Sequence, residues 1–179
     1  MCIFLINITI LLYTFYIFIY NIERYIKNSM ANAIKQLKPK KDSIYHQGVV
    51  DPKTCHKYVE SCKNEPIIYR SGLELQFMNY CENNPKIVKW ASEPIEIPYI
   101  SRMDKREHKY YPDYIIENEN GTRCIVEVKP YNQTIKPGAC DTMWLKEQWI
   151  KNVDKWTAAK AFAEKHGMKF IIVTEKFFL

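Results

Sequence analysis

The chain has 179 residues, a length that suits a single domain, and its apolar content of 47% is enough to bury a core. Its formal net charge of +6 is compatible with a polyanionic partner but is far from that of a histone-like tail. The six cysteines include no C-x-x-C pair, and Cys81 and Cys124 fall within a helix-like and a strand-like run. This pattern argues against a secreted disulfide scaffold and favours free thiols in a reducing compartment. The spacing of histidine and cysteine between residues 46 and 62 fits no familiar zinc pattern.

The first twenty residues carry no charge and are just long enough to span the hydrocarbon core of a bilayer as a helix. They lack the basic region and the small-residue cleavage site of a signal peptide. Two interpretations stay open: residues 1–20 are a membrane anchor, or the stretch is translated upstream DNA and the genuine start is Met30. We therefore set residues 1–29 apart as an apolar segment, and we expect a membrane as a partner only if this segment is translated.

Residues 30–65 are predicted to be basic and irregular. Lysines cluster near the beginning of this segment, and Pro39 and Pro52 discourage long regular elements. The segment is either an arm that lies along phosphates or a solvated linker, and the sequence leaves both interpretations open.

An amphipathic helix is predicted from about Arg70 to about Asn83, because the apolar residues of this segment recur at helical spacing. Ser71, with Glu74 three residues later, matches a capping box, in which the two side chains bond with unpaired backbone N–H groups. Glu74 therefore has two candidate roles, as a helix cap or as an acid that projects into a metal site. Its place about forty residues before a pair of further acids favours the second role.

Strands are predicted in the middle of the chain. Residues 87–100 are rich in β-branched residues, with a break near their middle, and a charged turn follows at residues 101–108. Residues 110–117 and 123–129 then form a hairpin, because Asn120-Gly121 marks a tight reversal.

A long helix is predicted at residues 141–166, with Gly167 in the place of a C-cap glycine and a further strand at residues 168–174. The long helix connects the second strand of the hairpin to the strand at residues 168–174. This order predicts a crossover connection between two strands of one sheet, and hence a mixed sheet in an α/β fold. Three tryptophans of this helix are expected in the core rather than as platforms for bases: Trp144, Trp149 and Trp156.

The hairpin carries the arrangement PD…ExK, in which Pro112-Asp113 precedes Glu127-Val128-Lys129. Side chains at positions i and i+2 share one face of a strand, so Glu127 and Lys129 project together, and Asp113 on the neighbouring strand reaches the same place. Two carboxylates about 4 Å apart repel each other by on the order of 4 kcal/mol at an effective dielectric constant near 20. A fold keeps such a pair only if cations offset the repulsion, and hard oxygen ligands suit Mg²⁺.

A surface ion pair between Glu127 and Lys129 is the alternative, and it would contribute about 0–1 kcal/mol. The apolar run around these residues indicates an inner strand instead, and charges at the end of a buried strand point to function. We expect Asp113 and Glu127 to hold Mg²⁺, for which Mn²⁺ can substitute, and Glu74 to bind the metal directly or through water. Lys129 orients or deprotonates a water molecule, or neutralises charge in the transition state. Weaker candidates for contacts with DNA are Arg70, Gln133, Lys136 and Lys155.

These residues resemble the PD-(D/E)xK nuclease superfamily, and the resemblance covers about residues 66 to 178. Beyond the acids and the lysine, several motifs are similar to the head-completion nuclease family of T-even-like tailed phages and, more distantly, to the catalytic domain of TnsA-type transposon endonucleases. These motifs are Ser71-x-x-Glu74-x-x-Phe77, Asn84-Pro85-x-Ile87, Pro94, Ile97-Pro98-Tyr99, Tyr111-Pro112-Asp113 and Ile125-Val126-Glu127-Val128-Lys129-Pro130. TnsA-type enzymes tend to have another residue in place of Glu127, so the glutamate favours the phage-like branch.

The resemblance implies a restriction-endonuclease-like mixed sheet flanked by helices over residues 66–179, Mg²⁺ dependence and double-stranded DNA as substrate. For the phage family it also implies a role in finishing packaged capsids, with capsid or portal proteins as partners and a location in the host cytoplasm or the virion. The leading hypothesis is therefore a Mg²⁺-dependent DNA endonuclease that acts on packaged DNA ends. The alternatives are a capsid-completion or DNA-end-binding protein with a vestigial nuclease site, a TnsA-like transposon endonuclease, and a nuclease anchored in a membrane through residues 1–20.

Overall fold

The computed structural model of the chain describes residues 47–59 and 65–179. The predicted apolar segment at residues 1–29, with its two interpretations, and most of the predicted basic arm lie outside the described residues. Within the described ranges, no helix combines the length and the apolar character that crossing a membrane requires.

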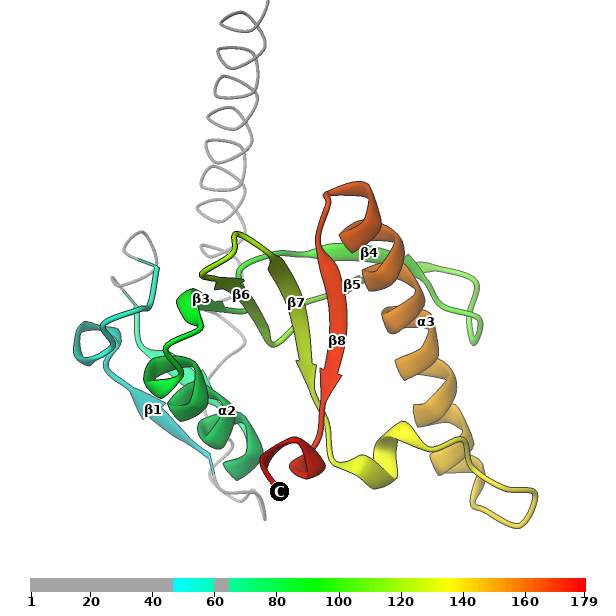
Figure 1. The fold of residues 1–179 in the computed structure, drawn as a ribbon. Helices are drawn as coiled ribbons and strands as arrows, with labels where there is room; N and C mark the ends of the chain where they lie inside the picture. Colours follow the sequence, from blue (N-terminus) through cyan, green and yellow to red (C-terminus); the bar gives the residue numbers. More distant parts are fainter. Residues whose placement is uncertain (1–46, 60–64) are drawn as a thin grey trace, which may run out of the picture. The chain divides into compact units, whose positions relative to one another are not determined.

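The centre of the fold is a four-stranded mixed sheet (Figure 1). Neighbouring strands are antiparallel except for the last pair, which is parallel. The long helix α3 (Met143–Lys165) provides the crossover that a parallel pair requires, so the predicted mixed α/β sheet is confirmed. In spatial order the strands are β3 (Ile87–Ser92), β6 (Tyr114–Asn118), β7 (Arg123–Val128) and β8 (Lys169–Val173).

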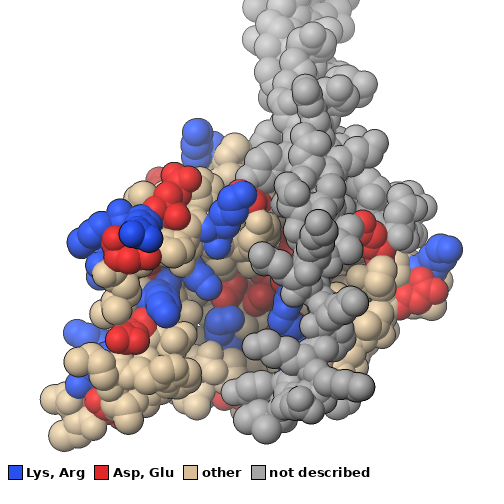
Figure 2. Space-filling view, turned by 180° about the vertical axis from the view of Figure 1, so that it is seen from behind, with Lys and Arg blue, Asp and Glu red and all other residues tan. Residues whose placement is uncertain are grey.

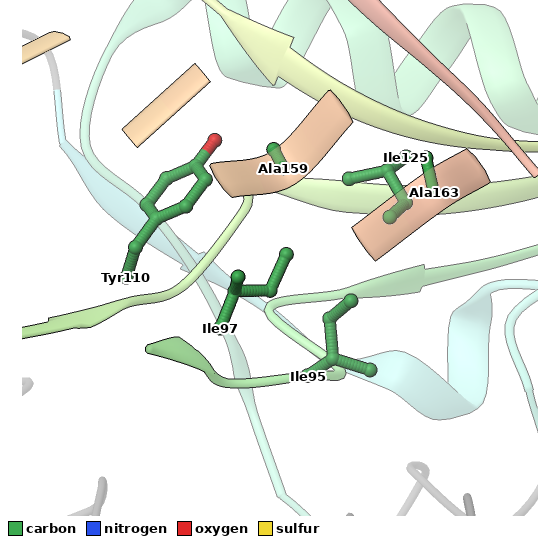
Figure 3. Close-up of a cluster of buried hydrophobic side chains, with 6 residues drawn as sticks. All are labelled: Ile95, Ile97, Tyr110, Ile125, Ala159 and Ala163. Atoms are coloured by element: carbon green, nitrogen blue, oxygen red, sulfur yellow. The ribbon is translucent and has the colours of Figure 1, made fainter. Parts of the chain in front are cut away.

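Strand β7 is buried on both faces, because a helix covers each of them. On one face Phe77, from helix α2 (Gly72–Asn83), packs against Tyr114 of β6 with ring centroids 5.1 Å apart. On the other face Ile125 belongs to a buried cluster that includes Ala159 and Ala163 of α3 (Figure 3). Burial from both sides explains why this strand reads as a continuous apolar run rather than an alternating one.

Local signals in the sequence fix the ends of these elements, and the predicted capping box at Ser71 and the predicted turn at Gly121 are among them. The Ser71 side chain accepts a hydrogen bond from the backbone N–H of Glu74 (3.2 Å), and Thr142 caps α3 in the same way through Leu145 (3.3 Å). Gly121 in the hairpin turn has φ +77°, a backbone conformation that most other residues adopt only with strain.

The predicted strand at residues 110–117 is wrong in one respect, because the chain leaves one sheet and enters another in the middle of it. The first part ends β5 (Glu107–Tyr110), which pairs with β4 (Ile97–Ile100) in a separate two-stranded sheet. The second part is β6 in the central sheet. Pro112, which lacks a backbone N–H to donate to a ladder, stands at the break. The predicted strand at residues 87–100 divides between the same two sheets.

The prediction that Trp144 belongs to the core is also wrong. Its side chain is 64% exposed, whereas Trp156 is only 7% exposed. Helix α3 has 23 residues and is therefore about 34 Å long, whereas a six-residue strand such as β7 spans about 20 Å. The first turns of the helix extend past the strands, so they have less of the sheet to pack against.

Residues 47–59, which together with Glu65 are the described part of the predicted irregular arm, contain regular structure and pack on the domain. Strand β1 (Gly48–Val50) pairs with β2 (Ile67–Tyr69), and a 3-10 turn, η2 (Pro52–Thr54), follows. The Glu82 carboxylate on α2 accepts hydrogen bonds from the backbone N–H groups of His56 (2.9 Å) and Lys57 (3.1 Å) and from the indole N–H of Trp90 (2.6 Å). One carboxylate thus joins this segment, α2 and β3.

We predict that Glu82→Ala lowers the free energy of unfolding by about 2–4 kcal/mol, because it removes the acceptor of a buried indole N–H and of two backbone N–H groups. Urea unfolding followed by tryptophan fluorescence measures this loss. Glu164→Ala, on the exposed face of α3, is the control and should change stability by less than about 0.5 kcal/mol. Equal stability of the two variants would contradict the anchoring role of Glu82.

Candidate active site

The predicted acids and lysine lie where β6 begins and β7 ends. Tyr114 is opposite Val126 in the antiparallel register, so Asp113, one residue earlier, lies beside Glu127. The backbone N–H of Val128 donates a hydrogen bond to Asp113 Oδ2 at 2.7 Å, which fixes the carboxylate against β7. The alternation along β7 places Glu127 on the same face as Ile125, toward α3. The carboxylates therefore share one face of the sheet.

Glu127 is 3% exposed and has a defined partner for each carboxylate oxygen. Lys129 Nζ lies 2.9 Å from Oε1, and the Tyr110 hydroxyl donates a hydrogen bond to Oε2 at 2.5 Å. The Lys129 side chain is 25% exposed, and that of Glu127 only 4%. The alternative of a solvated surface ion pair between these two residues is therefore wrong.

The charges of the site perturb one another. The pKa of Asp113 is raised well above its ordinary value, first by burial and then by the negative charge of Glu127. Burial alone would lower the pKa of Lys129, but Glu127 and Asp113 outweigh it and raise that pKa, so Lys129 stays a cation. The pKa of Tyr110 is raised by burial and by Glu127, which keeps the phenol protonated as a donor. Ionising both carboxylates of the site is therefore unfavourable in the absence of a further cation.

The capping role predicted for Glu74 is present in the structure. Its carboxylate accepts hydrogen bonds from the backbone N–H of Arg70 (2.8 Å) and from the Ser71 hydroxyl (2.9 Å). Its charge nevertheless reaches the site, where it raises the pKa values of Asp113 and Lys129. Direct or water-mediated metal binding by Glu74 stays a prediction.

The four weaker candidates for contacts with DNA divide into two groups. Burial acts to lower the pKa of Arg70, but its ion pair with Glu93, with smaller contributions from Glu74 and Asp113, raises that pKa, so Arg70 borders the site. Lys155 of α3 also borders the site, with Nζ 5.6 Å from the ring centroid of Tyr110. Two others, exposed in the loop that follows β7, are Gln133 and Lys136. On the face shown in Figure 2, acidic side chains lie in a hollow with Lys and Arg side chains around it.

The donor set fits a hard divalent cation in its chemistry. Asp113 and Glu127 supply carboxylate oxygens on one face, and the raised pKa of Asp113, caused first by burial and then by Glu127, means that a cation would favour ionisation of both acids. Mg²⁺ characteristically binds through one or two protein carboxylates and keeps several waters, so two acids suffice. Among the described residues, no group of three or more His, Cys, Asp or Glu side chains is gathered closely enough to hold a metal ion. Asp113 and Glu127 are the neighbouring carboxylates of this site that could hold such an ion.

Tyr110 is the site residue that the sequence analysis missed. Its ring lies in the buried cluster beside Ala159, and its hydroxyl points away from Ile95 and Ile97 (Figure 3). A buried tyrosine hydroxyl needs a hydrogen-bond partner, and this need is the one signal in the sequence that could have pointed to Tyr110. That signal did not identify Glu127, because the two residues belong to different sheets.

Two comparisons with known proteins show what the chain is similar to. A family model described as "TnsA-like endonuclease N terminal" matches residues 84–175. The chain is also 35% identical over 133 residues to the "Head completion nuclease" of Enterobacteria phage T4, and this match covers 69% of the chain and 87% of the phage protein. The chain belongs to the TnsA-like endonuclease family. It therefore has the restriction-endonuclease-like PD-(D/E)xK fold, and its family implies DNA as the substrate.

The match to this endonuclease family is informative about individual residues. Residues 84–175 include Asp113, Glu127, Lys129 and Lys155, whereas Glu74 lies before the matched range. The matched segment thus carries the two carboxylates and the lysine, together with the helix that covers them.

The perturbed acid predicts a pH-dependent stability. An aspartate with a raised pKa in the folded state costs stability once the unfolded state ionises: the cost is absent below about pH 4, grows as pH rises toward the folded-state pKa, and persists above it. In EDTA, Asp113→Asn should therefore raise the free energy of unfolding at pH 7 by at least about 1 kcal/mol, since each pKa unit corresponds to about 1.4 kcal/mol. The difference in the free energy of unfolding between Asp113→Asn and wild type should become smaller as pH falls toward 4.

Urea unfolding between pH 4.5 and 8 measures this difference, and the exposed Glu119→Gln is the matched control. An Asp113→Asn protein no more stable than wild type at pH 7 would show that the carboxylate carries no such cost.

Proposed function

We propose that this endonuclease is Mg²⁺-dependent and that Asp113 and Glu127 hold the metal. The observation that carries the proposal is the pair of carboxylates on one face of the sheet, one of them with a strongly raised pKa, beside a lysine that stays charged. Mn²⁺ should substitute for Mg²⁺, because oxygen ligands of this kind suit both ions.

The bound ion would polarise the scissile phosphate and lower the pKa of a coordinated water molecule. The protein's own residues have separable tasks. Tyr110 and Lys129 hold the two oxygens of Glu127 in place, at 2.5 and 2.9 Å. The Val128 N–H orients Asp113, and the Lys129 ammonium, close to both acids, stabilises negative charge that develops on the phosphate.

We further propose that the substrate is double-stranded DNA and that the protein acts on packaged DNA ends during phage head completion. The support is the identity to the phage T4 head completion nuclease over 87% of that protein's length. Capsid or portal proteins would then be partners, and the protein would be found in the host cytoplasm or the virion. A capsid-completion protein with a vestigial site is the competing proposal, and a direct assay of cleavage separates the two.

The assay incubates the full chain with supercoiled plasmid and Mg²⁺. Wild type should nick or linearise the plasmid with Mg²⁺ or Mn²⁺ and not in EDTA. Asp113→Asn, Glu127→Gln and Lys129→Met should each lose at least about 100-fold in rate, because each removes an interaction with the metal or the transition state. Lys160→Met, an exposed position on α3, is the control and should retain the wild-type rate. Equal cleavage by all variants, or cleavage in EDTA, would overturn the metal-dependent site.

Glu74 can be tested separately, because glutamine serves in a capping box but carries no charge. If Glu74 assists the metal, Glu74→Gln should keep the wild-type melting temperature and lose about 10-fold or more in cleavage rate. Glu74→Ala should lose both stability and activity, since it removes the acceptor for Arg70 and Ser71. Wild-type cleavage by Glu74→Gln would restrict Glu74 to the capping role.

A further inference from the structure

A second lysine reaches the site from the helix that covers it. Lys155 lies one turn before Ala159, which is fully buried against β7 in the cluster of Figure 3. This position directs the side chain across the ring of Tyr110, with Nζ 5.6 Å from the ring centroid. Tyr110 in turn donates its hydroxyl to Glu127. Lys155 thus borders the same acidic group as Lys129 but comes from a different element.

The charges around Lys155 place it within electrostatic reach of the whole site. The pKa of Lys155 is lowered, first by burial and also by the positive charges of Lys129 and Lys151, although Glu127 and Asp113 oppose this effect. In the described part of the chain, no carboxylate lies within 4.0 Å of this ammonium and it makes no hydrogen bond. Lys129, by contrast, is paired with Glu127 at 2.9 Å.

A simple packing role explains this arrangement less well. A lysine that only covers apolar surface extends its amine outward into water. Lys155 is half-buried, and its amine lies over the ring of Tyr110, whose hydroxyl donates a hydrogen bond to Glu127. A partly desolvated cation without a bonded anion is poorly solvated as it stands, and an anion that arrives at the site would compensate it. A phosphate of the substrate is such an anion.

We propose that Lys155 is a second catalytic cation, which contacts a non-bridging oxygen of the scissile phosphate and stabilises the charge that gathers there in the transition state. The inference rests on the proposed function of the site. In the hydrolysis, the oxygen of water bonds to phosphorus, one bridging P–O bond breaks, and the proton lost by the water ends on the departing oxygen. Lys155 forms no covalent bond and gives up no proton, and its contribution is electrostatic.

A catalytic cation and a general DNA contact differ in which kinetic parameter they change. A contact made only in the transition state lowers kcat when it is removed, whereas a contact that binds substrate and transition state equally raises KM. Lys151 is the matched control, because it lies one turn earlier on α3, is also half-buried, and is the lysine that influences Lys155 from its own helix.

Kinetics on a linear duplex with Mg²⁺ test the proposal with the full-length protein. Lys155→Met should lower kcat about 100-fold and change KM by less than about threefold, the loss that removal of one transition-state donor causes elsewhere. Lys155→Arg should recover at least a tenth of the wild-type kcat, since it restores the charge. Lys151→Met should leave kcat within about threefold of wild type, because Lys151 lies one turn further from Ala159 along α3. Thermal melting checks each variant, and if Lys155→Met does not fold, Lys155→Gln gives the same comparison.

Two results would overturn the inference alone: a Lys155→Met protein with the wild-type kcat and KM, or a Lys155→Met protein in which only KM changes. Absence of Mg²⁺-dependent cleavage by the wild-type protein would instead overturn the proposed function, and the role of Lys155 with it. One set of measurements therefore distinguishes failure of the role proposed for Lys155 from failure of the proposed nuclease function.

Discussion

The site depends on the enforced proximity of two carboxylates. Asp113 and Glu127 are held beside each other by the register of β6 and β7 and by the hydrogen bond from the Val128 N–H. The pKa of Asp113 is raised first by burial and then by the charge of Glu127, so ionising both carboxylates costs free energy in the absence of a metal. Lys129 offsets part of the charge. The fold therefore keeps an electrostatic cost in its free state that a divalent cation would remove, a pattern common at sites selected for function rather than stability.

The rest of the fold makes this cost tolerable. Strand β7 is buried on both faces, by α2 and by α3, and the acid–x–lysine triplet stands at the end of that strand. Each neighbouring element then contributes one polar group: the β4–β5 sheet supplies Tyr110, and α3 supplies Lys155. The apolar residues of β7 pack against the two helices and hold the strand in place. The charged residues Glu127 and Lys129 follow at the end of the same strand.

Much of this could be predicted from local patterns. The capping box at Ser71, the Asn120-Gly121 turn, the long helix and the acid–x–lysine triplet all express short-range rules, and each predicted element is present. The features that the sequence did not predict depend on tertiary contacts. The break at Pro112 moves the chain between two sheets, and the contact between Tyr110 and Glu127 depends on how those sheets pack. The apolar pattern of α3 indicated a buried face but not where the sheet ends, so Trp144 was placed in the core although it is exposed.

The most direct test of the central claim is a crystal structure of the protein soaked in Mn²⁺, with data collected for anomalous scattering from the metal. The account predicts a peak within about 2.5 Å of one carboxylate oxygen of Asp113 and one of Glu127, a distance typical of oxygen ligands to such ions. It also predicts that the peak is lost in Asp113→Asn. A peak elsewhere, or a peak that persists in that variant, would contradict the assignment of these two acids to the metal.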